Sequence, residues 1–306
     1  MLNPQLDRRG ELAHLLTTEG LPRRHVERLL QMASAPAAAD DSQLPAAPEM
    51  PVFLCLPDTD AADRDAFAAA AASLSMLPVP LDAQDALALA ETVAALAPGV
   101  LVLRHGQSGA AHCAAAHAAP GLRVLNAGDA RHADPVSALA RVEAITEIKP
   151  DLTHLVVTLV GDIRHSRLAR SIIHLLTTLG VPEVRAAAPR TLLPEGLAQL
   201  GVRACATLQE GLTDADVVIA LPLNVEEISG AQLPSAREYA CTHGLTPAAL
   251  AVARSDVLLL PAGPLVPGVE VDGDIAAALE PTEARLAVLE QRLRTTVLRV
   301  LAGATS

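Results

Sequence analysis

Aromatic side chains are almost absent from this sequence. Of 306 residues only Phe53, Phe67 and Tyr239 are aromatic, and there is no tryptophan. Proteins that hold single-stranded nucleic acid stack its bases on aromatic rings, so the sequence excludes a platform of that kind. Hydrophobic residues nevertheless make up 51% of the chain, so a sizeable core can be built from Leu, Val, Ile and Ala.

Basic charge is also scarce. The chain has 23 Lys and Arg against 35 Asp and Glu, a formal net charge of -12, and Lys149 is the only lysine. A nucleic acid or an anionic membrane requires a basic face, so neither is expected as a partner. A mechanism that needs a lysine has one candidate in this chain.

Cysteines are few and scattered. The four of them show no CxxC spacing, which disfavours zinc or a disulfide framework and favours reduced core thiols; no metal and no cofactor is expected. The first residues contain no long apolar stretch, so no signal peptide is expected. The alanine-rich run 66–81 is broken by Pro78 and Pro80 and is interpreted as a helix and a strand rather than a membrane span. The expected location is the cytoplasm.

Residues 10–33 predict a pair of helices, because Pro22 suits a first helical turn and apolar residues recur after it at helical spacing. The Pro- and Ala-rich segment 34–50 predicts a loop. Strands and helices then alternate. The expected strands are 52–56, 77–81, 100–103, 122–126, 155–160, 184–188, 216–221 and 257–261. The expected helices are 61–74, 84–96, 108–117, 135–148, 165–179, 194–200 and 280–302. This alternation predicts an α/β protein with two doubly wound parallel sheets.

Ligands of open parallel sheets bind beyond the carboxyl ends of the strands. The segments expected there are 57–65, 104–109, 127–137, 161–167 and 222–227. Gly161 follows a strand, but no GxGxxG is present, which disfavours NAD. Arg104 and His105 open a helix and form either an anion site or a solvated helix start. His132 and Asp134 suggest a structural pair, and no Ser-His-Asp set or HExxH supports a hydrolase or metalloenzyme.

Taken together, several of these segments resemble one family. LRHGQSGAAH, VLNAGDARHADP, LVGDIRHSRLARS, DADVVIALPLN and PAGPLVPGVEVD are similar, in order and spacing, to the catalytic chain of aspartate carbamoyltransferase, in particular the bacterial type that assembles with a dihydroorotase-like chain. The resemblance implies a carbamoyl-phosphate domain of residues 1–136, an aspartate domain of residues 150–279 and a C-terminal helix within 280–306 that returns to the first domain. It also implies a trimer, either of this chain alone or mixed with an active paralogue, with sites between neighbouring subunits.

The family transfers a carbamoyl group to the amine of aspartate for pyrimidine synthesis, and it works by holding two anionic substrates with positive charge. By resemblance, Arg104 matches an arginine that contacts carbamoyl phosphate, and Arg167 matches one that grips an aspartate carboxylate. Elsewhere the family pattern is lost. The departures are Asp60, Asp63 and Arg64 in the phosphate loop; Asp82 for the mobile loop's lysine; Asp134 for histidine; Val136 and Ser137 for threonine and glutamine; Pro222 and Asn224 for arginine and glutamine; and Pro261 and Ala262 for histidine and proline, before a retained Gly263-Pro264.

Losing one oxyanion donor costs about 10²–10³ in rate, so the departures predict a catalytically silent homologue with a structural or regulatory role. Two alternatives stay open. One is an active carbamoyltransferase, for aspartate or another amine, whose site has diverged or is completed by a partner chain. The other is a folded relic without a selected role.

Overall fold

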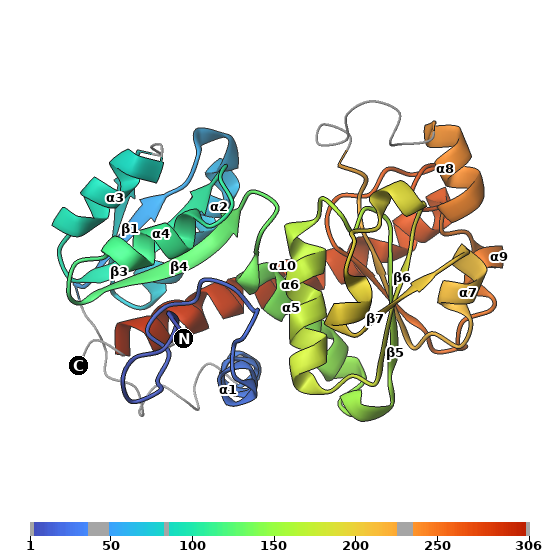
Figure 1. The fold of residues 1–306 in the computed structure, drawn as a ribbon, viewed down its shortest axis with the longest axis horizontal. Coiled ribbons are helices and arrows are strands. Elements are labelled where there is room, and N and C mark those ends of the chain that lie inside the picture. The colour runs from blue at the N-terminus through green and yellow to red at the C-terminus, as the bar shows by residue number, and fades with distance from the viewer. Residues whose placement is uncertain (1–2, 36–48, 83–85, 225–234, 304–306) are drawn as a thin grey trace. The chain divides into compact units, whose positions relative to one another are not determined.

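The computed structural model describes residues 3–35, 49–82, 86–224 and 235–303. The chain divides into two compact units, each with its own parallel sheet (Figure 1). Unit 1 consists of Met1–Ala140 and Val288–Ser306, and unit 2 of Arg141–Ala287. The divisions fall inside helices α5 (Pro135–Ile148) and α10 (Gly273–Gly303), so each of these helices contributes residues to both units.

The sheet of unit 1 has four parallel strands in the order β2-β1-β3-β4. They are β1 (Pro51–Cys55), β2 (Leu77–Leu81), β3 (Gly99–His105) and β4 (Leu122–Asp129). Strand β2 contains Pro78 and Pro80 and lies at the edge, the only place where a sheet tolerates prolines. The connecting helices are α2 (Ala61–Ser73), α3 (Ala86–Ala95) and α4 (Ala110–His117). The chain reverses direction across the sheet after β2, so right-handed crossovers place α2 on one face and α3 and α4 on the other.

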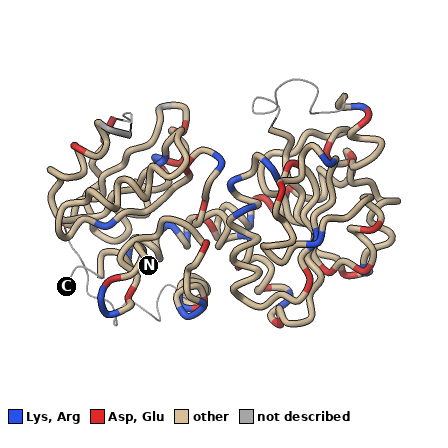
Figure 2. Tube along the Cα trace, in the orientation of Figure 1, with Lys and Arg blue, Asp and Glu red and all other residues tan. Residues whose placement is uncertain are grey.

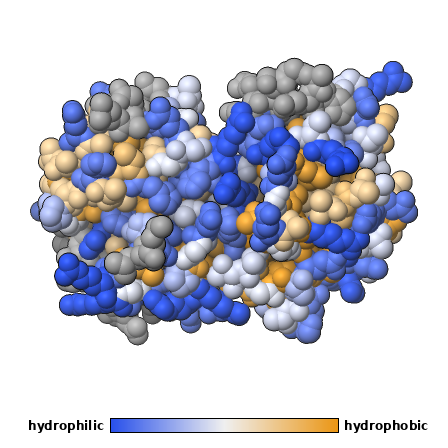
Figure 3. Space-filling model, in the orientation of Figure 1, coloured by the Kyte–Doolittle hydropathy of each residue, from blue (hydrophilic) through white to orange (hydrophobic). Residues whose placement is uncertain are grey.

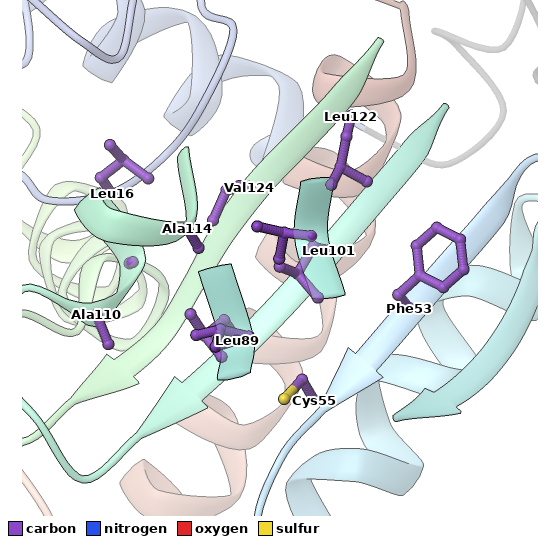
Figure 4. Close-up of a cluster of buried hydrophobic side chains, with 12 residues drawn as sticks. Leu16, Phe53, Cys55, Leu89, Leu101, Ala110, Ala114, Leu122 and Val124 are labelled. Carbon is purple, nitrogen blue, oxygen red and sulfur yellow. The ribbon is translucent and has the colours of Figure 1, made fainter. Parts of the chain in front are cut away.

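Alternate residues of the strands form the core beneath α3 and α4. Phe53 and Cys55 of β1, Leu101 of β3 and Val124 of β4 point to this face (Figure 4), as the two-residue period of a strand requires. The helices meet them with small side chains such as Ala114. Because alanines fill so much of this interface, the core closes without a large aromatic residue except Phe53.

The N-terminal segment departs from the predicted helix pair. Only the second helix forms, as α1 (Arg23–Ser34). The residues before it are extended: Leu15 bridges Leu125 in the parallel sense, and the side chain of Gln5 accepts hydrogen bonds from the backbone of Leu16 and Thr17. The prediction was wrong because β4 and Gln5 satisfy the backbone groups that a helix would have satisfied internally. Of the predicted loop 34–50, residues 36–48 lie outside the described residues.

Unit 2 has five parallel strands in the order β7-β6-β5-β8-β9. They are β5 (Val156–Val160), β6 (Glu183–Ala187), β7 (Val202–Cys205), β8 (Val217–Ala220) and β9 (Leu258–Pro261). The helices are α6 (Arg167–Leu179), α7 (Leu208–Leu212), α8 (Ala236–His243) and α9 (Pro247–Leu250). Strand β7 was not predicted. The predicted helix 194–200 is wrong, because the chain forms 3-10 turns η3 (Arg190–Leu192) and η4 (Leu197–Leu200) instead, the second flanked by left-handed Gly196 and Gly201.

The C-terminal helix returns to unit 1, as predicted. Within that unit, the Gln291 amide donates to the carbonyl of Ala66 at 3.0 Å, and the Arg294 guanidinium lies 5.3 Å from the ring centre of Phe67. Both partners belong to α2, so the end of α10 packs on the sheet face opposite α3 and α4. Helix α10 is longer than predicted because it begins at Gly273 and continues through Pro281. No helix in the described part of the chain is long and apolar enough to cross a membrane.

Candidate functional site

Arg104 lies at the position in unit 1 where an open sheet binds ligands. The chain leaves β1 for β2 and then returns to β3, so β1 and β3 are the neighbouring strands whose connections diverge. Cys55 pairs with Leu103 in this register. Arg104 therefore projects just beyond the paired ends, beside the 3-10 turn η1 (Asp58–Asp60) and the start of α2.

Two carboxylates hold the Arg104 guanidinium. Its Nη1 lies 2.6 Å from Asp63 Oδ2 and 3.4 Å from Asp60 Oδ2, and its Nε donates to the carbonyl of Ala127 at 2.9 Å. Burial opposes the charge, but Asp134, Asp63 and Asp60 together raise the pKa of Arg104 above its ordinary value. The structure thus brings four sequence-predicted residues together, Arg104 with Asp60, Asp63 and Asp134. The carboxylates of the same chain neutralise the charge of Arg104.

Asp63 also holds a second arginine, which the sequence did not suggest. Its Oδ1 lies 2.7 Å from Nη2 of Arg294, 231 residues further along the chain. Arg294 is buried, contacts Glu290 at 3.3 Å and lies over Phe67. A contact at this separation leaves no local pattern, although an arginine on the apolar side of the last helix was a possible signal.

Arg64 has a different role from its neighbours. Its Nη2 donates to the carbonyls of Leu56 at 3.2 Å and Pro57 at 3.0 Å. These are the residues that lead from β1 into η1, and the carbonyl of Pro57 also accepts a hydrogen bond from the backbone of Asp60 at 3.0 Å. Arg64 therefore stabilises the connection that positions Asp60 and Asp63.

Asp134 begins helix α5. Its Oδ1 accepts a hydrogen bond from the backbone of Ser137 at 3.3 Å, a typical helix-capping contact. The carboxylate of Asp134 therefore caps the first turn of its own helix, where it accepts from the N–H group three residues further along the chain. His132 Nδ1 lies 2.9 Å from Asp129 Oδ2, so the structure gives His132 a carboxylate partner that the sequence did not suggest.

Asp129 is the centre of a buried polar network. It accepts hydrogen bonds from Asn126 at 2.8 Å, from the backbone of Gly109 at 2.7 Å and from the backbone of Ala133 at 3.0 Å. Burial raises its pKa, but His132 and these donors outweigh burial and hold the pKa below the ordinary value. The network fixes the ends of β3 and β4, which is a structural role.

Two positions bear on the lysine that the family resemblance requires. Asp82 is exposed at the end of β2, and its carbonyl accepts from the thiol of Cys55 at 3.5 Å. Lys149 belongs to unit 2, where its Nζ lies 2.7 Å from Asp256.

Unit 2 has a corresponding position between β5 and β8, because the chain runs outward through β6 and β7 before returning to β8. Gly161 follows β5 with a φ of +122°, and a Cβ there would lie 2.4 Å from the carbonyl of Leu221. Only glycine allows the two strand ends to approach so closely. Arg167 follows as the first residue of α6, whose cap is Ser166.

Acidic side chains gather at this edge of unit 2. Buried Asp162 accepts from His165 Nδ1 at 2.9 Å, and Asn224 Nδ2 lies 3.4 Å from it. Burial, together with the carboxylates of Glu270 and Asp162, raises the pKa of Tyr239 well above its ordinary value. The GD-x-x-H spacing after β5 was a signal for the Asp162–His165 pair.

Glu270 organises the loops around Pro222. Its carboxylate accepts from the backbone of Leu223 and of Val266, both at 2.9 Å. Pro222 in turn packs against Gly263, where an added Cβ would lie 3.2 Å from the proline ring. The structure therefore brings Pro222, Asn224 and Gly263 to one edge of the sheet. The place of Pro222 and Asn224 after a strand was predicted, whereas Gly263 lay outside the segments expected there.

No known protein-family model matches the chain, but solved structures match along almost its whole length. Aspartate transcarbamoylase of Trypanosoma cruzi superposes with a TM-score of 0.76 at 20% identity, covering 98% of this chain and 100% of that one. Ornithine carbamoyltransferases of Gloeobacter violaceus and Pyrococcus furiosus give TM-scores of 0.75 and 0.74 at 18% and 19% identity. They cover 95% of this chain and 99% and 97% of their own. The chain has the transcarbamoylase fold, with two parallel-sheet α/β units and a C-terminal helix.

Proposed function

We propose that this chain is a catalytically silent member of the aspartate carbamoyltransferase family, with a structural or regulatory role in the cytoplasm. One observation carries the proposal. The arginine that matches the family's carbamoyl-phosphate contact, Arg104, is held by Asp63 at 2.6 Å and by Asp60 at 3.4 Å. An incoming phosphate meets two carboxylates instead of a free cation.

The size of the electrostatic repulsion in unit 1 supports the proposal that the chain is catalytically silent. Two like charges about 4 Å apart repel by roughly 4 kcal/mol at a surface-like dielectric, and a dianionic phosphate beside Asp60 and Asp63 experiences this more than once. Asp134 stands where the family has a histidine that polarises the carbamoyl oxygen, and its carboxylate caps α5. The loss of one such donor costs about 10²–10³ in rate.

Unit 2 supports the same conclusion for the second substrate. Aspartate carries two carboxylates, and this edge of the sheet presents Asp162 and Glu270, both buried. Pro222 cannot donate the hydrogen bonds of the arginine that it replaces in the resemblance. Arg167 is the remaining candidate clamp, and one charge-assisted hydrogen bond contributes about 1.5–3 kcal/mol.

A trimer, of this chain alone or mixed with an active paralogue and with a dihydroorotase-like chain as a further partner, belongs to the same proposal. Acidic and basic positions are interspersed along the traces of both units (Figure 2). Apolar surface lies over α3 and α4 in unit 1 (Figure 3), two helices composed largely of alanine. Such a surface supports association through unit 1.

The test is calorimetric titration with N-(phosphonacetyl)-L-aspartate, the bisubstrate compound bound in a second structure of the Trypanosoma cruzi enzyme. The natural chain should give no saturable heat. The triple variant Asp134→His, Pro222→Arg, Asp82→Lys should gain affinity, because it restores the donors that the family uses. Saturable binding by the natural chain would instead support an active enzyme with a diverged or partner-completed site.

A control must separate restored donors from added positive charge. The double variant Glu280→Lys, Glu283→Lys adds the same four units of charge at exposed positions of α10. It should bind the compound no better than the natural chain. If it gains as much affinity as the triple variant, the site positions have been assigned wrongly.

A further inference from the structure

Helix α4 carries a cysteine and a histidine one helical turn apart, separated by three alanines. The Sγ atom of Cys113 lies 3.8 Å from Nδ1 of His117. The side of α4 that faces the sheet is formed by other residues, among them Ala110 and Ala114 (Figure 4). Cys113 is half-buried and His117 is exposed. The thiol and the imidazole therefore lie together on a flank of α4 that solvent reaches.

We infer that Cys113 and His117 form a two-ligand clip for a zinc-type divalent cation, with water in the remaining coordination positions. In the H-E-x-x-H arrangement, two side chains four residues apart on one helix face bind a single zinc ion. Thiolate and imidazole are the ligands that zinc prefers. The absence of CxxC spacing, which disfavoured zinc in the sequence, does not apply to a clip built on one turn of a helix.

The separation of the two donor atoms indicates which coordination geometry they fit. A tetrahedral ion about 2.3 Å from sulfur and about 2.0–2.1 Å from nitrogen holds these two atoms about 3.6 Å apart. With the same bond lengths, the right angle of an octahedral site would hold them about 3.1 Å apart. The observed 3.8 Å is closer to the tetrahedral value. The pair therefore suits zinc better than magnesium, which requires octahedral geometry and oxygen ligands.

Binding of the cation must displace protons. His117 Nδ1 also lies 2.9 Å from the carbonyl oxygen of Cys113, so in the metal-free chain this ring nitrogen carries the proton and donates it. Zinc ligands are deprotonated, so the cation replaces the proton of the ring nitrogen and that of the thiol, and affinity should rise with pH. Within the part of the chain that the structure describes, no third histidine, cysteine or acidic side chain joins the pair. We therefore expect an exchangeable site rather than a closed structural one.

The test is a titration of the purified, reduced protein with Co²⁺, which takes zinc sites and reports its ligands by absorption. The natural chain should develop a sulfur-to-cobalt charge-transfer band that saturates at one ion per chain and disappears when zinc is added. Cys113→Ser should remove the band. His117→Gln should weaken binding at least about tenfold, which is the cost of losing even an outer partner of a metal ligand.

The matched control is Cys241→Ser. Cys241 is the exposed cysteine of helix α8, and no histidine follows it at four residues, so this variant should titrate like the natural chain. A natural chain without the band, a band that persists in Cys113→Ser, or an affinity unchanged in His117→Gln would overturn the inference. If Cys113→Ser does not fold by circular dichroism, His117→Gln decides alone, because it changes the exposed last residue of α4. Carbamoyl transfer does not enter this test, so either proposal can fail without the other.

Discussion

Asp63→Asn should lower the stability of the protein by an amount that its surroundings define. The Asp63 side chain is 28% exposed, and its partners Arg104 and Arg294 are 14% and 11% exposed. Exposed ion pairs contribute about 0–1 kcal/mol, whereas removing one partner of a buried pair costs about 3–5 kcal/mol. This site lies between the two limits. Since Asp60 and Glu290 remain to balance the arginines, we expect a loss of about 2 kcal/mol in the free energy of unfolding.

The assay is urea denaturation followed by circular dichroism, arranged as a double-mutant cycle with Arg294→Gln. The coupling energy between Asp63 and Arg294 should be about 1–2 kcal/mol, because the two groups are in contact. The control Asp65→Asn should stay within about 0.5 kcal/mol of the natural chain. A coupling energy near zero would show that the bridge between α2 and α10 does not form in solution, so that Asp63 does not hold Arg104 and Arg294 together.

Three further predictions concern other parts of the chain. Burial and the charge of Arg123 lower the pKa of His14 to about 4. Between about pH 6.5 and pH 4 the unfolded chain therefore binds a proton at His14 that the folded chain does not bind, so the free energy of unfolding should fall as the pH drops through this range. The variant His14→Gln should make the free energy of unfolding less dependent on pH there. Gly161→Ala should lower the free energy of unfolding by about 3 kcal/mol or more in denaturant titrations, because a Cβ at Gly161 would lie 2.4 Å from a carbonyl. The control Gly201→Ala should lower it by about 1 kcal/mol, because a Cβ there meets nothing within 4 Å. Light scattering at micromolar concentration should give the mass of a trimer, and a monomer would contradict the proposed assembly.

The parallel sheets could be predicted because the inner strands β1, β3, β5, β6 and β8 are buried on both faces and appear as short apolar runs between helical segments. Strand β7 could not, because Arg203 and Ala204 are exposed at the sheet edge and the apolar run is lost. The segment before α1 has apolar residues at helical spacing, but Leu15 pairs with β4. Pairings between distant segments override local periodicity there.

The candidate site was predictable in position and less so in contacts. Arg104 lies at the end of β3, and Pro222 and Asn224 follow β8, so their placement at the strand ends comes directly from the sheet topology. The bridge from Asp63 to Arg294 joins residues 231 apart in the sequence, and it depends on how α10 packs on α2. Side-chain partners of that kind are fixed by tertiary packing, which the spacing of residues does not encode.

The most direct measurement of the central proposal is a colorimetric assay of carbamoyl aspartate formation by the purified natural chain, at saturating carbamoyl phosphate and aspartate. No turnover above background is expected, because carboxylates neutralise Arg104 and, by resemblance, Asp82 and Asp134 stand where the family has a lysine and a histidine. Turnover within about a hundredfold of ~10 s⁻¹, the median for enzymes, would contradict it and establish the chain as a working carbamoyltransferase.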